Sequence, residues 1–253
     1  WVNPLLRAAG VRHRWLPSNM LIVLIGHLVL CVGGVSPQVH PSSDAAATQL
    51  LAAGPCVAMY THGSNFDPII VSSLGYGVKH IYKRELGRIP IFGWALFLYR
   101  HVSVDRKNRE KAIAQLARAV RSVTRTGQSL AISPEGTRSR TGELLEFKKG
   151  PFHTAVAAKA PVVPIVIRGA YELLPPKHKT WDAGDVDVVV LPAIPTEGKE
   201  PEQLSMEVRA AITACIAERK ADEEQSQKRR VAARKAKNAS VLTAVPAALV
   251  LGA

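Results

Sequence analysis

A histidine and an aspartate stand five positions apart in the segment YTHGSNFDP, which covers residues 60–68. Histidine is the side chain best suited to act as a general base near neutral pH, and a neighbouring carboxylate can fix the tautomer of its ring. Asp67 also has a simpler interpretation, because an aspartate followed by a proline is typical of a helix N-cap and a first helical residue. That interpretation leaves His62 without a role, so the choice between them depends on the rest of the chain.

The elements that must position this pair follow a regular pattern. Short apolar runs alternate with amphipathic stretches, which is typical of βαβ units. We therefore expect an α/β fold with a mixed, mostly parallel sheet flanked by helices. Helical spacing of apolar residues predicts helices at 108–126 and 201–219. Candidate strands cover residues 56–61, 78–82, 101–104, 129–133, 162–168 and 186–191.

Loops rich in polar, charged or glycine residues follow four consecutive candidate strands. Open α/β sheets bind ligands at the carboxyl edge of their strands, so folding would bring these loops together. The segment from Lys79 to Lys149 contains 16 Lys and Arg against 6 Asp and Glu, which favours a ligand that bears phosphate. The four loops contain His62 to Asp67, KRELGRIPIFGW from Lys83, Asp105 with Arg106, and PEGTRSRTG from Pro134.

The composition restricts the classes of function. Lys and Arg number 33 against 20 Asp and Glu, and the net charge of +13 suits nucleic acid, an anionic membrane or a phosphorylated metabolite. Only 6% of the residues are aromatic, and no zinc-finger or RNA-recognition motif is present, which argues against nucleic acid. Cys31, Cys56 and Cys215 have the spacing of neither a disulfide framework nor a zinc site.

Common enzyme motifs are missing from the sequence. No G-x-S-x-G is present, which makes a serine hydrolase improbable. No G-x-x-x-x-G-K-[ST] is present either, and GYGVKH at Gly75 does not fit the dinucleotide-binding motif. What remains is attack by the substrate's own hydroxyl, in which His62 takes the proton and Asp67 orients the imidazole. Backbone donors or cations would stabilise the oxyanion.

Four sequence blocks resemble, in the same order, those of the 1-acylglycerol-3-phosphate acyltransferases of glycerophospholipid synthesis. HGSNFD is similar to the H-x4-D motif, and KRELGRIPIFGW with the later DR is similar to the second block. PEGTRS, continuing into FKKG, is similar to the third block, and VVPIVI to the fourth. The resemblance covers residues 55–195, and Thr61 and Ser133 differ from the residues that often precede the first and third blocks.

This resemblance implies transfer of a fatty acyl group from acyl-CoA or acyl carrier protein to the sn-2 hydroxyl of lysophosphatidic acid, which gives phosphatidic acid. It implies a glycerolipid acyltransferase-like fold and contact with membrane lipid. It implies no nucleic acid partner, no metal and no cofactor. His62 would be the general base and Asp67 its orienting partner. The residues implied to bind substrate are Lys83, Arg106, Glu135, Gly136, Thr137 and Arg138.

Several alternatives stay open. Glu135 and Arg138 suit a loop-bracing salt bridge as well as a substrate contact, and Lys83 suits an ion pair with Glu85. The lysines at 148–149 suit acyl-CoA phosphates, lipid headgroups or water. The acceptor could instead be glycerol-3-phosphate or another lysophospholipid. A non-catalytic basic protein that binds lipid or RNA would account for the charge but would leave the His–Asp pair idle.

An apolar run, MLIVLIGHLVLCVGGV, covers residues 20–35 and follows Arg7, Arg12 and Arg14. As a helix it reaches roughly 24 Å, short of a hydrocarbon core of ~30 Å. A short or tilted transmembrane helix, a re-entrant or monotopic anchor, and a signal-peptide core are the competing interpretations. The lack of a small-residue cleavage site disfavours the last of them. We expect localisation at a membrane, with the active site facing the cytosol, at the endoplasmic reticulum or the bacterial inner membrane.

The expected organisation has three parts. Residues 1–54 form the membrane-associating segment and a connector rich in Pro, Ser and Ala at 36–54, residues 55–220 form the catalytic domain, and residues 221–253 form a charged and then apolar tail. Basic residues near 228–237 suit a solvated helix end or a contact with anionic lipid. Because the first residue is Trp, we expect a fragment or a processed form.

Overall fold

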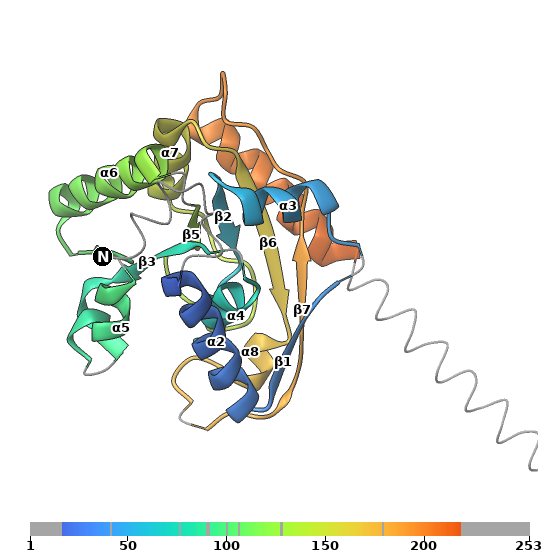
Figure 1. Cartoon of the computed structure of the whole chain (residues 1–253). Helices are drawn as coiled ribbons and strands as arrows, with labels where there is room; N and C mark the ends of the chain where they lie inside the picture. Colours follow the sequence, from blue (N-terminus) through green and yellow to red (C-terminus); the bar gives the residue numbers. More distant parts are fainter. Residues whose placement is uncertain are drawn as a thin grey trace, which may run out of the picture. The chain divides into compact units, whose positions relative to one another are not determined.

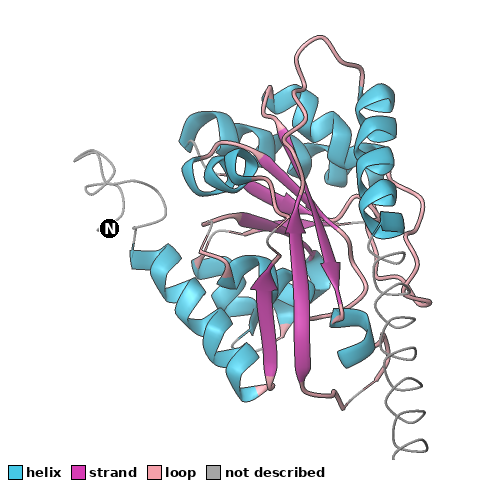
Figure 2. Ribbon diagram, turned by 90° about the vertical axis from the view of Figure 1, so that its right-hand side faces the viewer, coloured by secondary structure: helices cyan, strands magenta, loops and turns pink. Residues whose placement is uncertain are grey.

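A seven-stranded sheet forms the centre of the fold. The computed structural model describes residues 17–40, 42–75, 77–89, 92–99, 101–105, 107–126, 129–178 and 180–218. The strands lie in the order β1-β7-β6-β2-β5-β3-β4, and every neighbouring pair is parallel except β6 with β7. Helices lie on both sides of the sheet (Figure 2). The expectation of a mixed, mostly parallel α/β sheet flanked by helices is confirmed.

Six of the seven strands lie where apolar runs predict them. The central strand β2 is buried at all four positions, as a continuous apolar run predicts for a strand covered on both faces. The strands are β1 (Val35–Val39), β2 (Val57–Tyr60), β3 (Lys79–Lys83), β4 (Val102–Val104), β5 (Leu130–Ile132), β6 (Val162–Arg168) and β7 (Gly184–Val190).

The helices include the two that apolar spacing predicts, α6 and a last helix at 201–218. A short 3₁₀ helix, η2, connects β3 to α5. The helices with defined ends are α2 (Pro17–Val32), α3 (Ala45–Ala53), α4 (Asp67–Ser73), η2 (Arg84–Arg88), α5 (Phe92–Leu98), α6 (Arg109–Thr126), α7 (Lys149–Ala158) and α8 (Ala170–Leu173).

The stretch expected to be a connector forms β1 and α3 instead. Pro37 obscured the strand in the sequence, but β1 lies at the end of the described sheet, where a proline is tolerated because it removes no hydrogen bond to a neighbour. The start of α3 had a detectable signal. Asp44 is its N-cap, and the carboxylate accepts the N–H of Ala47 at 2.6 Å.

The topology directs the chemically interesting loops to one edge of the sheet. Strands β2, β3, β4 and β5 are parallel, so the loops that follow them leave the sheet on the same side (Figure 1). The loop after β2 contains His62, β3 leads into η2, and the turn at 133–139 follows β5. Strands β2 and β5, buried at every position, thus hold the two loops that the sequence predicts to act together.

Helix α2 has one packed side and one exposed side. It packs against α4, where a Cβ at Gly26 would lie 3.4 Å from the Cβ of Ser73, and Leu30 is buried. In the described part of the chain, no helix has the length and apolar character needed to cross a bilayer. The anchoring element therefore stays a prediction. The exposed large side chains of α2 are Met20, Leu21, Leu24, Ile25, Leu28, Val29 and Val32.

The chain divides into two compact units between Ile212 and Thr213. Only residues 213–218 of the second unit are described, and they form the end of the helix that starts at residue 201. The tail predicted at 221–253 and the three arginines before α2 lie outside the described residues.

Candidate active site

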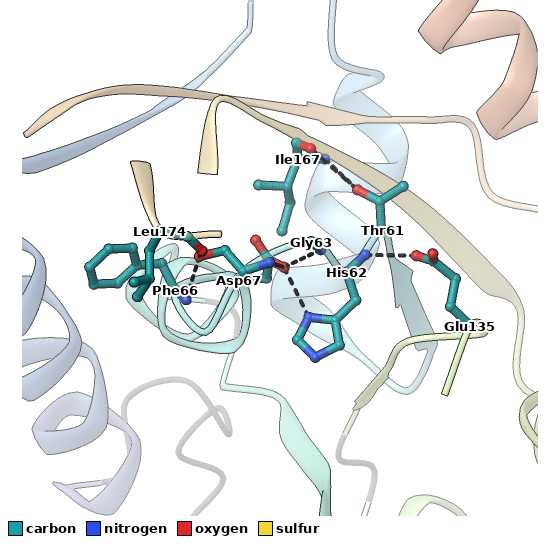
Figure 3. Close-up of polar contacts among 9 residues, drawn as sticks. Thr61, His62, Gly63, Phe66, Asp67, Glu135, Ile167 and Leu174 are labelled. Carbon is teal, nitrogen blue, oxygen red and sulfur yellow. Dashed lines mark hydrogen bonds and ion pairs between the residues drawn. The ribbon is translucent and has the colours of Figure 1, made fainter. Parts of the chain in front are cut away.

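His62 lies in the loop after β2, and Asp67 is the first residue of α4. Nδ1 of His62 lies 2.9 Å from Oδ2 of Asp67 (Figure 3). Because the carboxylate accepts this hydrogen bond, Nδ1 carries the proton and Nε2 is left to accept one. The side chain of His62 is 18% exposed and that of Asp67 only 1%, so a reactant reaches the imidazole but not the carboxylate. A general base held by an orienting carboxylate would have this geometry, and the catalytic roles of His62 and Asp67 stay predictions.

Asp67 also organises the loop that contains His62. Its Oδ2 accepts the N–H groups of Gly63 at 2.8 Å and of Ser64 at 2.7 Å. The N-cap of α4 is Phe66, with no side-chain cap, so Asp67 reaches back into the loop and its interpretation as an N-cap is wrong. Burial raises the pKa of Asp67, while the hydrogen bond from His62 and the two backbone donors act to lower it.

The turn after β5 holds the main chain of His62. Oε1 of Glu135 accepts the N–H of His62 at 2.8 Å, and the N–H of Ser139 donates to the carbonyl of His62 at 2.8 Å. Oε2 of Glu135 accepts the N–H of Leu145 at 3.0 Å. Glu135 therefore braces the loop through backbone groups, and the described residues contain no salt bridge between it and Arg138.

The rest of this turn presents the residues expected to bind substrate. Gly136 has φ +69°, and a Cβ there would lie 3.2 Å from Cγ of Lys148, so the turn needs glycine at this position. Thr137 is exposed and Arg138 is half-buried. Among the described residues, none forms an ion pair with the guanidinium of Arg138. That cation is thus available to an anionic ligand, and its substrate role stays a prediction.

Two of the other basic residues singled out in the sequence form exposed ion pairs, and one lies outside the described residues. Lys83 is exposed, and its Nζ lies 3.6 Å from Glu85, so the ion pair named as an alternative is present. Lys149 forms an exposed ion pair with Glu202 at 3.0 Å. Exposed pairs of this kind contribute little to stability, and the lysines can exchange them for a ligand. Arg106 lies outside the described residues.

Ser64, the serine nearest in sequence to His62, is fully used in structural hydrogen bonds. It is buried, donates from Oγ to the carbonyl of Leu174 at 3.1 Å and accepts the N–H of Phe66 at 3.3 Å. The site therefore presents no serine nucleophile beside the histidine, which favours direct transfer to an acceptor hydroxyl. Within the described ranges, no group of three or more His, Cys, Asp or Glu side chains is placed to hold a metal.

Comparison with known proteins identifies the family. The family model named Acyltransferase matches residues 39–168, just over half of the chain. The chain belongs to the acyltransferase family. The 1-acyl-sn-glycerol-3-phosphate acyltransferase of Pseudomonas aeruginosa is 32% identical over 167 residues, which cover 65% of this chain and 65% of that protein. The 1-acyl-sn-glycerol-3-phosphate acyltransferase alpha of Homo sapiens is 33% identical over 151 residues, which cover 59% of this chain and 53% of that protein.

A solved structure is similar to a larger share of the chain. The crystal structure of the 1-acyl-sn-glycerophosphate acyltransferase of Thermotoga maritima matches with a TM-score of 0.70 and 25% identity, and covers 80% of each chain. The chain spans about half the length of most curated relatives it matches.

Two further histidines that the sequence did not single out lie near His62 and Asp67. The rings of His80 on β3 and His101 before β4 are 5.4 Å apart, and Tyr60 contacts both His62 at 5.8 Å and His80 at 6.2 Å. His80 is buried, and its Nε2 lies 2.8 Å from Oγ of Ser72. Twenty-one positions separate the two histidines, so no local spacing pattern indicates the group.

We expect the free energy of unfolding to fall as the pH is lowered from about 6.5 to about 4. Burial lowers the pKa of His80 from 6.5 to about 4, and the charges of Lys79 and His62 act in the same direction. The unfolded chain therefore binds a proton over this range that the folded chain does not. Stability present above pH 6.5 is lost as the pH falls, by about 3 kcal/mol for this residue. Burial also lowers the pKa of His101, which adds to the loss.

Urea unfolding between about pH 7.5 and about pH 4 measures this effect. His80→Gln should flatten the pH dependence relative to that of the parent protein. The comparison with the parent protein isolates the contribution of His80, because burial also raises the pKa values of Asp67 and Glu135. An unchanged pH dependence in His80→Gln would contradict the prediction.

Proposed function

We propose that the protein transfers a fatty acyl group from the thioester of acyl-CoA or acyl carrier protein to the sn-2 hydroxyl of lysophosphatidic acid. The observation that carries this proposal is the contact between Nδ1 of His62 and Oδ2 of Asp67 in a chain of the acyltransferase family. The names of the similar proteins from Pseudomonas aeruginosa and Homo sapiens support the choice of acceptor.

The dyad accounts for each proton in the reaction. Nε2 of His62 removes the proton of the acceptor hydroxyl as its oxygen attacks the thioester carbonyl, and Asp67 stabilises the imidazolium that forms. Collapse of the tetrahedral intermediate breaks the C–S bond. The thiolate then takes the proton from His62, which restores the neutral ring. The products are the diacylated phosphate lipid and a free thiol.

A panel of acceptors tests the proposal. Purified protein with labelled acyl-CoA should acylate lysophosphatidic acid faster than glycerol-3-phosphate, other lysophospholipids or neutral monoacylglycerol. The same panel with acyl carrier protein identifies the donor. Preference for glycerol-3-phosphate would instead show that the enzyme acylates glycerol-3-phosphate, the alternative acceptor. Lack of acylation of every acceptor by folded protein would support a basic lipid-binding protein instead.

Arg138→Ala should lower kcat/KM for lysophosphatidic acid by about ten- to a hundredfold. A desolvated charge-assisted contact with phosphate is worth about 1.5–3 kcal/mol, and Arg138 is half-buried in the turn that holds His62. Arg138→Lys should restore only part of the loss, because lysine keeps the charge but not the bidentate geometry. The KM for acyl-CoA should stay unchanged, as steady-state kinetics with each substrate varied in turn will measure.

Exposed Arg140, two positions along the same turn, provides the matched control. Arg140→Ala should leave the acceptor kinetics unchanged. A rise in the acyl-CoA KM in Arg138→Ala, with acceptor discrimination intact, would assign Arg138 to the donor and contradict the acceptor site proposed for it.

We further propose that α2 docks the protein on the membrane without crossing it. Its exposed apolar side chains recur at helical spacing, at 20, 24, 28 and 32 and again at 21, 25 and 29, on the side away from α4. A second exposed pair lies on α5, where Trp94 is 68% and Phe97 is 78% exposed. Exposed apolar surface of this kind favours an interfacial helix. Docking on the cytosolic face would give His62 access to both a lipid acceptor and a cytosolic thioester.

A further inference from the structure

The main chain of His62 is held on both of its polar groups by a single turn. The N–H donates to Oε1 of Glu135 (Figure 3), and the carbonyl accepts the N–H of Ser139, each at 2.8 Å. Residue 62 therefore cannot move relative to the turn at 133–139 without breaking one of these two hydrogen bonds. The loop geometry that places the imidazole on Asp67 depends on contacts that are distant in sequence.

The carboxylate of Glu135 is buried and therefore not accessible to a substrate. Glu135 is 1% exposed, and its two oxygens accept the N–H groups of His62 at 2.8 Å and Leu145 at 3.0 Å. One backbone N–H donates to each oxygen, which fits the ionised carboxylate, because the O–H of a protonated carboxyl would point at an N–H group. Burial raises the pKa of Glu135, and the hydrogen bonds from Leu145 and His62 act against that rise.

A packed aromatic ring joins the same two loops. The ring of Tyr171 lies against both Gly63 and Gly142, whose added Cβ atoms would be 3.1 Å and 2.9 Å from it. Its hydroxyl donates to the carbonyl of Arg140 at 2.9 Å. The loop after β2 and the segment after β5 thus pack against each other, and Glu135 and Asp67 are buried carboxylates there.

We propose that Glu135 is a positioning residue, which acts on the reaction by holding the main chain of His62 rather than by binding the acceptor. This inference rests on the proposed function, because it takes His62 as the base. Loss of the contact would let the imidazole shift from its alignment, and a misplacement of about 1 Å costs about a hundredfold in rate. The acceptor and donor would bind as before.

Glu135→Gln is the decisive variant. Glutamine has nearly the same shape, but it can accept from only one of the two N–H groups and turns its NH₂ toward the other. We expect kcat, per folded enzyme, to fall by about ten- to a hundredfold, with the KM values for lysophosphatidic acid and acyl-CoA unchanged. Exposed Glu143 lies in the segment just after this turn, so Glu143→Gln is the matched control and should keep full kcat.

A double variant tests whether Glu135 acts through His62. Adding Glu135→Gln to His62→Ala should cause no further loss, because the imidazole that the contact positions is gone. Glu135→Asp keeps the charge but is one methylene shorter, so it should also lose kcat, and it provides the same comparison if the Gln variant does not fold.

Three results would overturn the inference: a raised acceptor KM with kcat unchanged, an equal loss in the presence and absence of His62, or full kcat in folded Glu135→Gln. Failure of the proposed function gives a different result. If folded His62→Ala retained its activity, the base itself would be wrongly assigned. If His62→Ala lost activity while Glu135→Gln did not, only the positioning role would fail.

Discussion

Replacing His62 by alanine is expected to lower kcat by about 10²–10⁴-fold while leaving the chain folded, because that is the usual contribution of a general base. The imidazole lies in a loop and is partly exposed, so its removal deletes little packing. Labelled acyl-CoA measures the rate, and thermal unfolding confirms the fold. Asp67→Asn should cost less, since it removes the orienting charge but leaves the base in place.

Ser64→Ala is the control for this experiment. Its hydroxyl is buried and bonded to Leu174 and Phe66, so its removal should lower stability and leave kcat substantial. Normal turnover by folded His62→Ala would rule out the dyad as the catalytic centre. An acyl group trapped on Ser64 would instead replace direct transfer with a covalent intermediate.

The second large effect is expected on membrane binding. Leu24 and Leu28 are 64% and 61% exposed on α2. Full burial of a leucine side chain is worth about 1.5–3 kcal/mol, so the two at this exposure contribute about 2–4 kcal/mol. Leu24→Asp with Leu28→Asp should therefore weaken binding to phosphatidylcholine–phosphatidylglycerol vesicles by about 30- to 1000-fold. Co-sedimentation of the full chain with these vesicles gives the affinity.

Met206 on the helix at 201–218 is equally exposed and apolar, at 67%, so Met206→Asp tests whether added negative charge alone reduces binding. An equal loss in that variant would argue against α2 as the docking face. Cysteine labels at the two ends of α2 then test monotopic docking, after replacement of exposed Cys31. Reaction of both labels from one side of sealed vesicles supports docking, and reaction from opposite sides contradicts it.

The parts of the site that depend on residue type and spacing were predictable from the sequence. His62 and Asp67 were identified as a pair because their chemistry is specific, and apolar runs located β2 and β5, which carry the two loops. The direction of a side chain was not predictable. A carboxylate before Pro68 fits an N-cap equally well, and only the folded loop shows that it turns back to Gly63.

The contacts of the Glu135 side chain were not predictable from the sequence either. The sequence shows a glutamate in a turn rich in cations, which suits a substrate contact or a salt bridge. Its bond to His62, 73 positions away, depends on β5 lying beside β2 in the sheet. Strand β1 was missed for a local reason, since Pro37 is unfavourable in most strands and its position at the end of the sheet is a tertiary property.

Pro37 also affects how copies of the chain can associate. The N–H of His40 donates to Val188 on β7, and successive N–H groups of a strand alternate in direction. Residue 37 therefore faces the side of β1 that has no neighbouring strand among the described residues. Proline leaves that position without a donor. A second sheet that approached this side would find a gap in the row of hydrogen bonds, which hinders edge-to-edge aggregation.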